Sequence, residues 1–240
     1  MTRKAYECLL LRTLAACGFY FAYLSASFAE PLEFTLLKTE SLTLSGDIVG
    51  RYFSVEYTPV NGTNTDGSYL IVIFADSQIP YHHAIKPIAI EKVTCLMQRC
   101  SRAVRAPISA IPYIVGIGSG DSANTVSATL LFTPGKLSGT PFRAALEIKS
   151  LMINSIVVSY TMPAGYRPSQ SGAWLGLWAG TAINGAEPLA KANIDSELSQ
   201  STQAINDLVI QSNFVYTLGL AAGPGVGDIA SLAVFKTGAY

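Results

Sequence analysis

The chain contains two histidines, His82 and His83, which are adjacent and follow Tyr81 in the segment IPYHHAIKP. Histidine can transfer protons or bind a metal ion near neutral pH. A catalytic histidine also needs a nucleophile and an orienting carboxylate, and the sequence has neither a GxSxG motif nor an HExxH pair. Adjacent side chains on a strand point to opposite faces, so a shared metal would require a turn here. We therefore predict no catalytic residue, no metal site and no cofactor.

The same segment is the best candidate for a ligand-binding loop. Pro80 and Pro87 flank it and favour an exposed turn. Flat rings in a rigid loop bury surface area at a small entropic cost, which suits sugars and protein partners. We predict that Tyr81, His82 and His83 contact such a ligand. The corresponding segment later in the chain, AINGAEP, has no aromatic residue, so the feature belongs to one part of the chain only.

Two cysteines, Cys95 and Cys100, are separated by four residues. In an oxidising compartment this pair is predicted to form a disulfide, and its short loop would restrain the unfolded chain by about 2 kcal/mol. The C-x-x-C spacing of redox-active thiols is absent. Basic residues opposed only by Glu91 surround the pair, which is typical of a solvated face or of a site for an anionic partner. These residues are Lys92, Arg99, Arg102 and Arg105.

Residues 1–29 have the pattern of an export signal: a basic start, an apolar stretch, and small residues before a cleavage point after Ala29. Two alternatives are a lipid on Cys17, within the segment LAAC, and a retained anchor. All three place the rest of the chain outside the cytosol. There, Asn61 begins an Asn-Gly-Thr triplet in a turn-rich stretch and is the predicted glycosylation site if the source is eukaryotic.

The composition excludes several classes of partner. Charged residues make up 13% of the 240 residues and the formal net charge is zero, so no overall field attracts nucleic acid or an anionic membrane. No uninterrupted apolar run reaches the roughly 20 residues of a membrane-spanning helix. We predict no nucleic-acid partner and no membrane span in the mature chain.

Two parts of the chain repeat one another at an offset of 103 residues. Phe53, Val55, Tyr57 and Thr58 correspond to Ile156, Val158, Tyr160 and Thr161, and residues 113–135 correspond to 216–238. Between these anchors an offset of 105 places Tyr69 on Trp174. Length changes that fall in turn-rich stretches are typical of loops. We predict that one module was duplicated.

Each repeat is predicted to be all-β. Residues 54–57 and 157–160 alternate between apolar and polar types, which suits a strand with one wet face. Residues 69–74 and 174–178 are continuously apolar and suit a central strand covered on both sides. Turn-forming residues separate these runs. Residues 194–208 have no apolar stripe and are predicted to be loop and strand.

Roughly seven short strands in each repeat favour an immunoglobulin-like sandwich. The predicted fold is therefore two tandem immunoglobulin-like β-sandwich modules from an internal duplication, preceded by a signal peptide. The modules are predicted at residues 30–134 and 142–240, with a linker at 135–141. Trp174 and Trp178 share one face of an apolar strand, so we predict that they are core residues.

The tripeptide SYT at residues 159–161, followed by AWLGLWAG at residues 173–180, resembles the signature of SKICH-type modules. In that family a Tyr-led strand precedes Asp-Trp-(Ile/Val)-Gly and a further aromatic residue. Ala173 stands in place of the Asp, and in the first repeat Tyr69 and Ile71 stand in place of the Trp and Gly. The resemblance implies an immunoglobulin-like sandwich. It carries no function over, because members of that family are mostly intracellular interaction modules.

These observations predict a secreted, non-enzymatic protein that acts as a structural, self-associating or surface-recognition component. Its partner would be a second copy, another protein or a glycan. One alternative is a carbohydrate-binding, lectin-like protein that uses Tyr81 and His82. Another is a secreted hydrolase built from the carboxylates Asp47, Glu56 and Asp66, although the repeat places serines opposite the first two.

Overall fold

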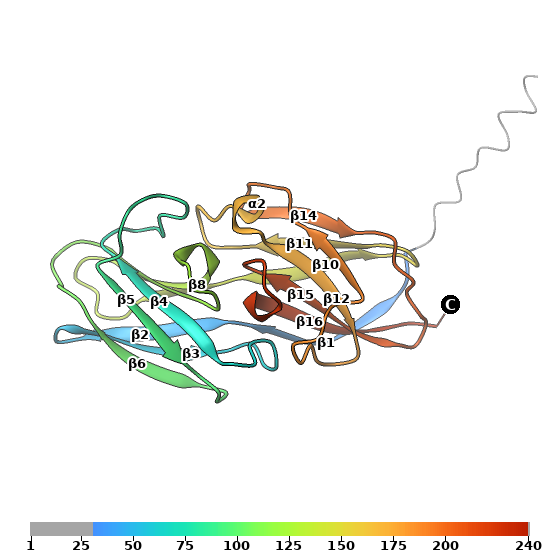
Figure 1. The fold of residues 1–240 in the computed structure, drawn as a ribbon, viewed down its shortest axis with the longest axis horizontal. Coiled ribbons are helices and arrows are strands. Elements are labelled where there is room, and N and C mark those ends of the chain that lie inside the picture. The colour runs from blue at the N-terminus through green and yellow to red at the C-terminus, as the bar shows by residue number, and fades with distance from the viewer. Residues whose placement is uncertain (1–30, 240) are drawn as a thin grey trace, which may run out of the picture. The chain divides into compact units, whose positions relative to one another are not determined.

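The computed structural model describes residues 31–239. The predicted signal peptide and the alternative lipidation site Cys17 lie outside the described residues. Strands dominate the described chain (Figure 1), which confirms the predicted all-β class. The other regular elements are the short helix α2 (Pro168–Ser171) and two 3-10 turns, η1 (Ala123–Thr125) and η2 (Val226–Asp228).

The first repeat forms a sandwich from a sheet of order β2-β3-β6 and a sheet of order β5-β4-β7-β8. The strands of the smaller sheet are β2 (Thr43–Val49), β3 (Tyr52–Thr58) and β6 (Cys100–Arg105). The strands of the larger sheet are β4 (Ser68–Phe74), β5 (Ala89–Thr94), β7 (Tyr113–Gly118) and β8 (Val126–Phe132). Buried and outward-facing residues alternate along β3, as predicted, because one face of that sheet meets solvent.

The second repeat has the same strand order. Its sheets are β10-β11-β14 and β13-β12-β15-β16. The strands are β10 (Ala145–Leu151), β11 (Ile156–Thr161), β12 (Trp174–Ala179), β13 (Ala190–Asn193), β14 (Gln200–Ile205), β15 (Val215–Ala221) and β16 (Ile229–Thr237). The matching order confirms two immunoglobulin-like sandwiches that arose by duplication, which lie at opposite ends of the ribbon in Figure 1.

The two repeats exchange their first strands. β1 (Phe34–Ser41) continues through Leu42 into β2, yet it pairs antiparallel with β16 of the second repeat. β9 (Thr140–Arg143) continues through Ala144 into β10, yet it pairs with β8 of the first repeat. The amides of Leu42 and Ala144 donate to β16 and β8 carbonyls at 2.9 and 3.0 Å, so the two joints are equivalent. Each larger sheet thereby gains a fifth strand from the other repeat.

The connection predicted as a linker, residues 135–141, is fastened to the first repeat. Its last two residues belong to β9. The Ile48 amide donates to the Leu137 carbonyl at 2.8 Å, and the Gly139 amide donates to the Gly46 carbonyl at 3.2 Å. The chain therefore passes between the repeats along β2.

Both larger sheets are buried on both faces, as their continuously apolar strands predicted. The loop after β4 covers the outer face of the first sheet with Ile79, which is 3% exposed, and the loop after β12 covers the second with Ile183, which is 1% exposed. Residues on the outer face of β4 cluster with the core of the second repeat, and both tryptophans of β12 cluster with the core of the first. Neither repeat buries its central strands alone.

The predicted correspondence between Tyr69 of the first repeat and Trp174 of the second is wrong by one residue. The central glycines of β7 and β15 are equivalent, and they face Val72 and Gly176, so the offset in these strands is 104. Tyr69 packs against Tyr57 inside the first sandwich, with 5.9 Å between ring centroids. Trp174 lies on the other face of its strand, 5.8 Å from the ring of the second tryptophan. Both tryptophans are buried, which confirms the prediction that they are core residues.

A pair of serines tests the strand exchange. Ser41 of β1 faces Ser231 of β16, with 2.9 Å between their hydroxyl oxygens. We expect the double variant S41C/S231C to form a disulfide within one chain on oxidation. In the chain-entropy model, closing a loop of this length stabilises the fold by about 5 kcal/mol, measured as the shift in urea unfolding between oxidised and reduced protein.

The wild-type protein, oxidised and reduced, corrects for the native disulfide, and S41C alone controls for the substitution. Covalent dimers in place of cross-linked monomers on a non-reducing gel would contradict the intramolecular exchange.

Candidate functional site

Tyr81 is buried, so the expectation of an exposed aromatic binding loop is wrong for this residue. Its side chain is 2% exposed and its hydroxyl donates to the Val126 carbonyl at 2.9 Å. Its ring meets the ring of Tyr166 edge-on, with 5.2 Å between centroids. The Tyr166 hydroxyl donates to the Ala222 carbonyl at 2.7 Å. Each tyrosine is anchored in its own repeat, and the ring contact joins the two.

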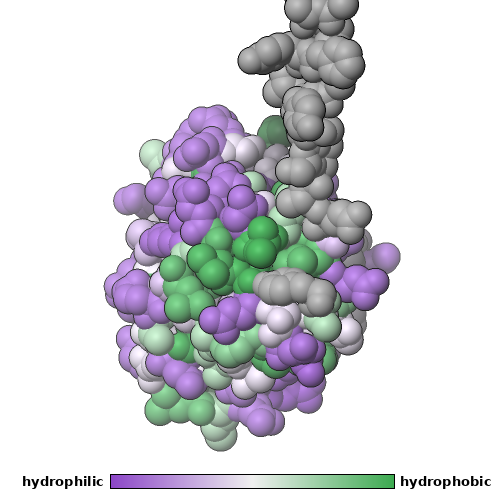
Figure 2. Space-filling view, turned by 90° about the vertical axis from the view of Figure 1, so that its right-hand side faces the viewer, coloured by the Kyte–Doolittle hydropathy of each residue, from purple (hydrophilic) through white to green (hydrophobic). Residues whose placement is uncertain are grey.

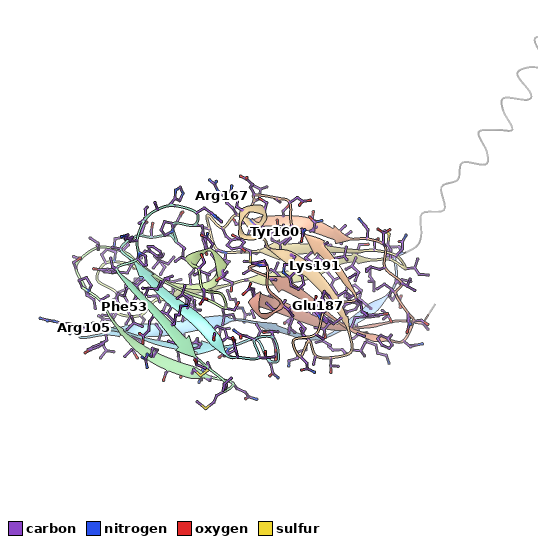
Figure 3. The ribbon with its side chains drawn as sticks, viewed as in Figure 1. Phe53, Arg105, Tyr160, Arg167, Glu187 and Lys191 are labelled. Carbon is purple, nitrogen blue, oxygen red and sulfur yellow. A yellow bond between two sulfur atoms is a disulfide. The ribbon has the colours of Figure 1, made fainter. Side chains whose placement is uncertain are left out.

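His82 lies at the same junction, whereas His83 is exposed. The backbone of His82 is left-handed, with a φ of 58°, and its amide donates to Asn124 Oδ1 at 2.9 Å. Its Nε2 lies 3.0 Å from the hydroxyl oxygen of Ser171 in α2. Partial burial lowers the pKa of His82 below its usual value, and Arg167, labelled beside α2 in Figure 3, acts in the same direction. The predicted binding loop thus contains a contact between the repeats.

The lowered pKa of His82 predicts a pH-dependent stability. The unfolded chain takes up this proton more readily than the folded one, so the contribution is present above about pH 6.5 and is lost as the pH falls below it. We expect the free energy of unfolding to fall between about pH 7.5 and about pH 5.5, and His82→Gln to remove part of that fall. Urea titrations at several pH values measure it. The exposed neighbour supplies the control, His83→Gln, and an unchanged pH profile in His82→Gln would contradict the assignment.

The three carboxylates of the hydrolase alternative make separate structural contacts. Asp47 accepts a hydrogen bond from the Ser138 hydroxyl at 2.5 Å. Glu56 forms an ion pair with Arg99 at 3.6 Å, and Asp66 accepts from the backbone N–H two residues later at 3.0 Å. General acid–base hydrolysis of a glycoside requires two carboxylates on opposite sides of one bond, whereas each of these three carboxylates is held by a structural contact of its own.

The residues between β5 and β6 form a loop that the disulfide closes. Cys95 and Cys100 are bonded as predicted, with 6.0 Å between their Cα atoms. The loop presents two apolar side chains to solvent, Leu96 at 76% and Met97 at 70% exposure. The Cys95 amide donates to the Gly67 carbonyl at 2.8 Å. Gly67 has a φ of 66°, and a Cβ there would lie 2.7 Å from the Cys95 carbonyl oxygen, so the two loops pack closely.

The basic cluster around the disulfide is largely neutralised. The ion pairs are Lys92–Asp121, Arg99–Glu56 and Arg102–Glu91. The expectation that Glu91 alone opposes the cluster is therefore wrong, because two of the carboxylates come from strands and loops far away in the sequence. Arg105 is the member of the cluster that has no ion pair within the described chain.

A groove of about 460 Å³ lies between β1, the loop at residues 59–67 and the disulfide loop. Its polar lining comes from Lys38, Glu40, Asn61, Asn64, Tyr69 and Gln98, and Leu96 and Met97 supply apolar surface. We call it the junction groove, because β1 belongs to a sheet of the second repeat while the loops belong to the first. The strand exchange brings these walls together.

Neutral polar groups surround a single ion pair in the junction groove. Lys38 pairs with Glu40, and Glu40 also accepts from the Asn61 amide at 3.4 Å. Asn64 Nδ2 donates to a backbone carbonyl at 2.6 Å. Burial raises the pKa of Tyr69 to about 12, so its hydroxyl remains protonated at neutral pH. These groups can exchange hydrogen bonds with the hydroxyls of a ligand, and Glu40 is the one carboxylate among the lining residues.

The predicted glycosylation residue, Asn61, lines this groove and is exposed. Thr63 of the same triplet is 2% exposed and donates to the Val60 carbonyl at 3.0 Å. The predicted glycosylation would therefore modify a residue that lines the groove.

Sequence reasoning missed the junction groove. Its walls, at Lys38 and at Gln98, lie far apart in the sequence, and no motif connects them. The sequence contains two features that belong to the groove: the spacing of the disulfide cysteines and the turn-rich stretch that begins at Asn61. Neither indicates that an exchanged strand lies beside both loops. The described residues contain no group of three His, Cys, Asp or Glu side chains that could hold a metal ion.

Removal of the disulfide tests the rigidity of this wall. We expect C95S/C100S to lower the free energy of unfolding by about 2 kcal/mol, because the bridge closes a short loop and mainly restrains the unfolded chain. Urea unfolding of the variant against the wild type measures the loss. A change below about 0.5 kcal/mol would mean that the packing of Gly67 against the loop, and not the covalent bridge, sets its conformation.

Comparison with known proteins gives a likeness of fold. The chain is similar to a segment of two fibronectin type III domains from chicken tenascin, at 16% identity and a TM-score of 0.29, over 86% of this chain and 99% of that one. It is also similar to the chicken CNTN1 FN1–FN3 domains, at 12% identity and a TM-score of 0.28, over 88% of this chain and 66% of that one. Because these TM-scores are low, the fold assignment rests on the strand order of the chain itself.

No family model matches the chain, so the resemblance to SKICH-type modules stays a prediction. No curated protein matches either. Within residues 31–239, no helix has the length and apolar character needed to cross a membrane.

Proposed function

We propose that the chain is a secreted, non-enzymatic recognition protein that binds a neutral oligosaccharide in the junction groove. The observation that carries the proposal is the groove itself, whose volume of about 460 Å³ is within the range of small-ligand sites. Its amide, hydroxyl and carboxylate groups match the hydroxyls of a sugar, and Met97 and Leu96 offer apolar surface for the faces of sugar rings. Charge plays a minor part, because the lysine and glutamate of the groove neutralise each other.

The walls of the groove are held before any ligand binds. The disulfide restrains the loop that contains Gln98, and the hydrogen bond from the Asn61 amide to Glu40 ties the second loop to β1. A site that is already ordered loses little conformational entropy on binding, which favours affinity. This rigidity supports recognition by a fixed surface.

Two further features support export and the absence of catalysis. A disulfide between Cys95 and Cys100 fits an oxidising compartment, and the leader-like sequence pattern of residues 1–29 agrees with it. Glu40 has no second carboxylate across the groove to complete an acid–base pair. The carbohydrate-binding alternative therefore moves from Tyr81 and His82, which lie at the junction of the repeats, to the groove.

A glycan array followed by calorimetry tests the proposal. We expect the wild-type protein to be retained by a neutral oligosaccharide, and Asn61→Ala and Gln98→Ala each to weaken binding about two- to tenfold. That range corresponds to the loss of one neutral hydrogen bond, about 0.5–1.5 kcal/mol.

The matched control is Gln203→Ala, which removes an amide from β14 in the other repeat. Equal losses in Gln203→Ala and Gln98→Ala, or retention by no glycan, would contradict the proposal. Release of a shortened sugar that Glu40→Gln abolishes would replace it with the hydrolase alternative.

A further inference from the structure

The far end of the second repeat carries an exposed apolar surface. Figure 2 views this end directly and shows hydrophobic residues gathered at its centre within a more hydrophilic surround. Val209 is 83% exposed, Leu189 is 65% exposed and Phe214 is 37% exposed. These residues line a recess of about 440 Å³ together with Asp207, which has no ion pair within the described chain. We call this surface the aspartate end, defined by Leu189, Asp207, Val209 and Phe214.

The far end of the first repeat is also apolar at its surface, but it is cationic. Arg51 and Arg105 line a shallow recess of about 710 Å³ with Ile108, and Ile111 in the following loop is 42% exposed. Figure 3 shows Arg105 pointing away from the ribbon at this end. Within residues 31–239, neither arginine has an ion pair. We call this surface the arginine end, defined by Arg51, Arg105, Ile108 and Ile111.

Three of the sheet edges, those of β1, β9 and β13, are poorly suited to pairing with a second copy. β1 has a bulge between Leu36 and Lys38 on its exposed edge, and β9 has only four residues, one of them Pro141. β13 also has four residues and contains Lys191. Short edges, bulges, prolines and lysines are the features that prevent pairing between sheet edges. The two ends, in contrast, combine exposed apolar residues with charges of opposite sign that have no ion pair within the described chain.

We propose that the arginine end of one molecule docks on the aspartate end of a second copy. Unpaired arginines meet an unpaired carboxylate, and the exposed apolar residues of both ends leave water together. Because the two surfaces differ, the contact is head to tail, and repetition of a head-to-tail contact builds an open chain unless its rotation closes a ring. The proposal is independent of the junction groove, which lies away from both ends.

Charge reversal at each end tests the contact. We expect the molar mass of the purified protein in sedimentation velocity to rise with concentration and to fall at high salt. Asp207→Arg makes both ends cationic, and R51D/R105D makes the arginine end anionic like its partner. Each variant alone is expected to require about tenfold higher concentration to assemble, because like charges then oppose across the contact.

A mixture of the two variants is the decisive experiment. In the mixture every contact again joins a cationic end to an anionic end, so alternating assembly is expected to return. The control Asp195→Arg reverses an exposed carboxylate away from both ends and should assemble as the wild type does. Failure of the mixture to assemble while the wild type does, or a wild type that keeps the mass of one chain at every concentration, would overturn the proposal.

Two other occupants of the aspartate end would also overturn it. The first alternative is that lipid covers this surface. In that case the monomeric protein floats with neutral phosphatidylcholine vesicles, and Val209→Asp abolishes the flotation. The second alternative is that the chain's own residues 1–30 cover the aspartate end. In that case the protein keeps the mass of one chain, and residues 1–30 resist proteolysis in the wild type but not in Val209→Asp. Glycan binding that persists when assembly fails would leave the proposed function in place.

Discussion

The exchange of β1 and β9 between the repeats is the constraint on which the rest of the structure depends. An immunoglobulin-like sandwich can normally bury its core alone, but here the outer face of each larger sheet is buried as well. β4 and β12 are apolar on both faces, so their outer faces must also be covered from water. The exchanged strands hold the repeats in the arrangement that covers these faces, and the pairing of β1 with β16 joins segments separated by most of the chain. Such distant pairing is expected to slow folding, because the cost of closing the loop comes before the contacts that offset it.

Loops that would be free in an isolated sandwich serve as joints in this one. Tyr81 and Tyr166 come from different loops of their repeats, and their rings meet between the two. The turns that follow β7 and β15 are equivalent, and they also meet: the Ser119 hydroxyl donates to Asp228 Oδ1 at 3.4 Å. Burial raises the pKa of Asp228, and hydrogen bonds from the Gly225 amide and Ser119 partly offset that effect. Ser119 and Asp228 are therefore satisfied by the other repeat or by their own turn, whereas the buried Trp174 Nε1 on the outer face of β12 has no hydrogen-bond partner within the described chain.

The sequence predicted what depends on neighbours along the chain and missed what depends on distant partners. Alternation along β3, continuous apolar runs at β4 and β12, and the disulfide are local patterns, and the structure contains each of them. The offset of 104 in the central strands was missed because a strand that is apolar on both faces has no alternation to fix its register. Tyr81 was expected at the surface because prolines flank it, yet the partner that buries it, Tyr166, lies in the other repeat. The same reason explains the unrecognised ion pairs and the unrecognised groove.

Substitutions within two equivalent pairs of walls explain why one groove is polar and the other is not. β1 and β9 are equivalent strands. Their registers show that Thr140 corresponds to Lys38 and that Phe142 corresponds to Glu40. At the equivalent position lies a smaller recess of about 260 Å³, lined by Phe142, Pro163 and Ala164 among others. It has no ion pair, no amide in place of Asn61 and no disulfide loop beside it. The fold thus presents the same pair of walls twice, and the substitutions within them make one groove polar and rigid and the other small and apolar. The proposed binding of a hydroxyl-rich ligand therefore depends on the residues that line the first groove and not on the repeated fold.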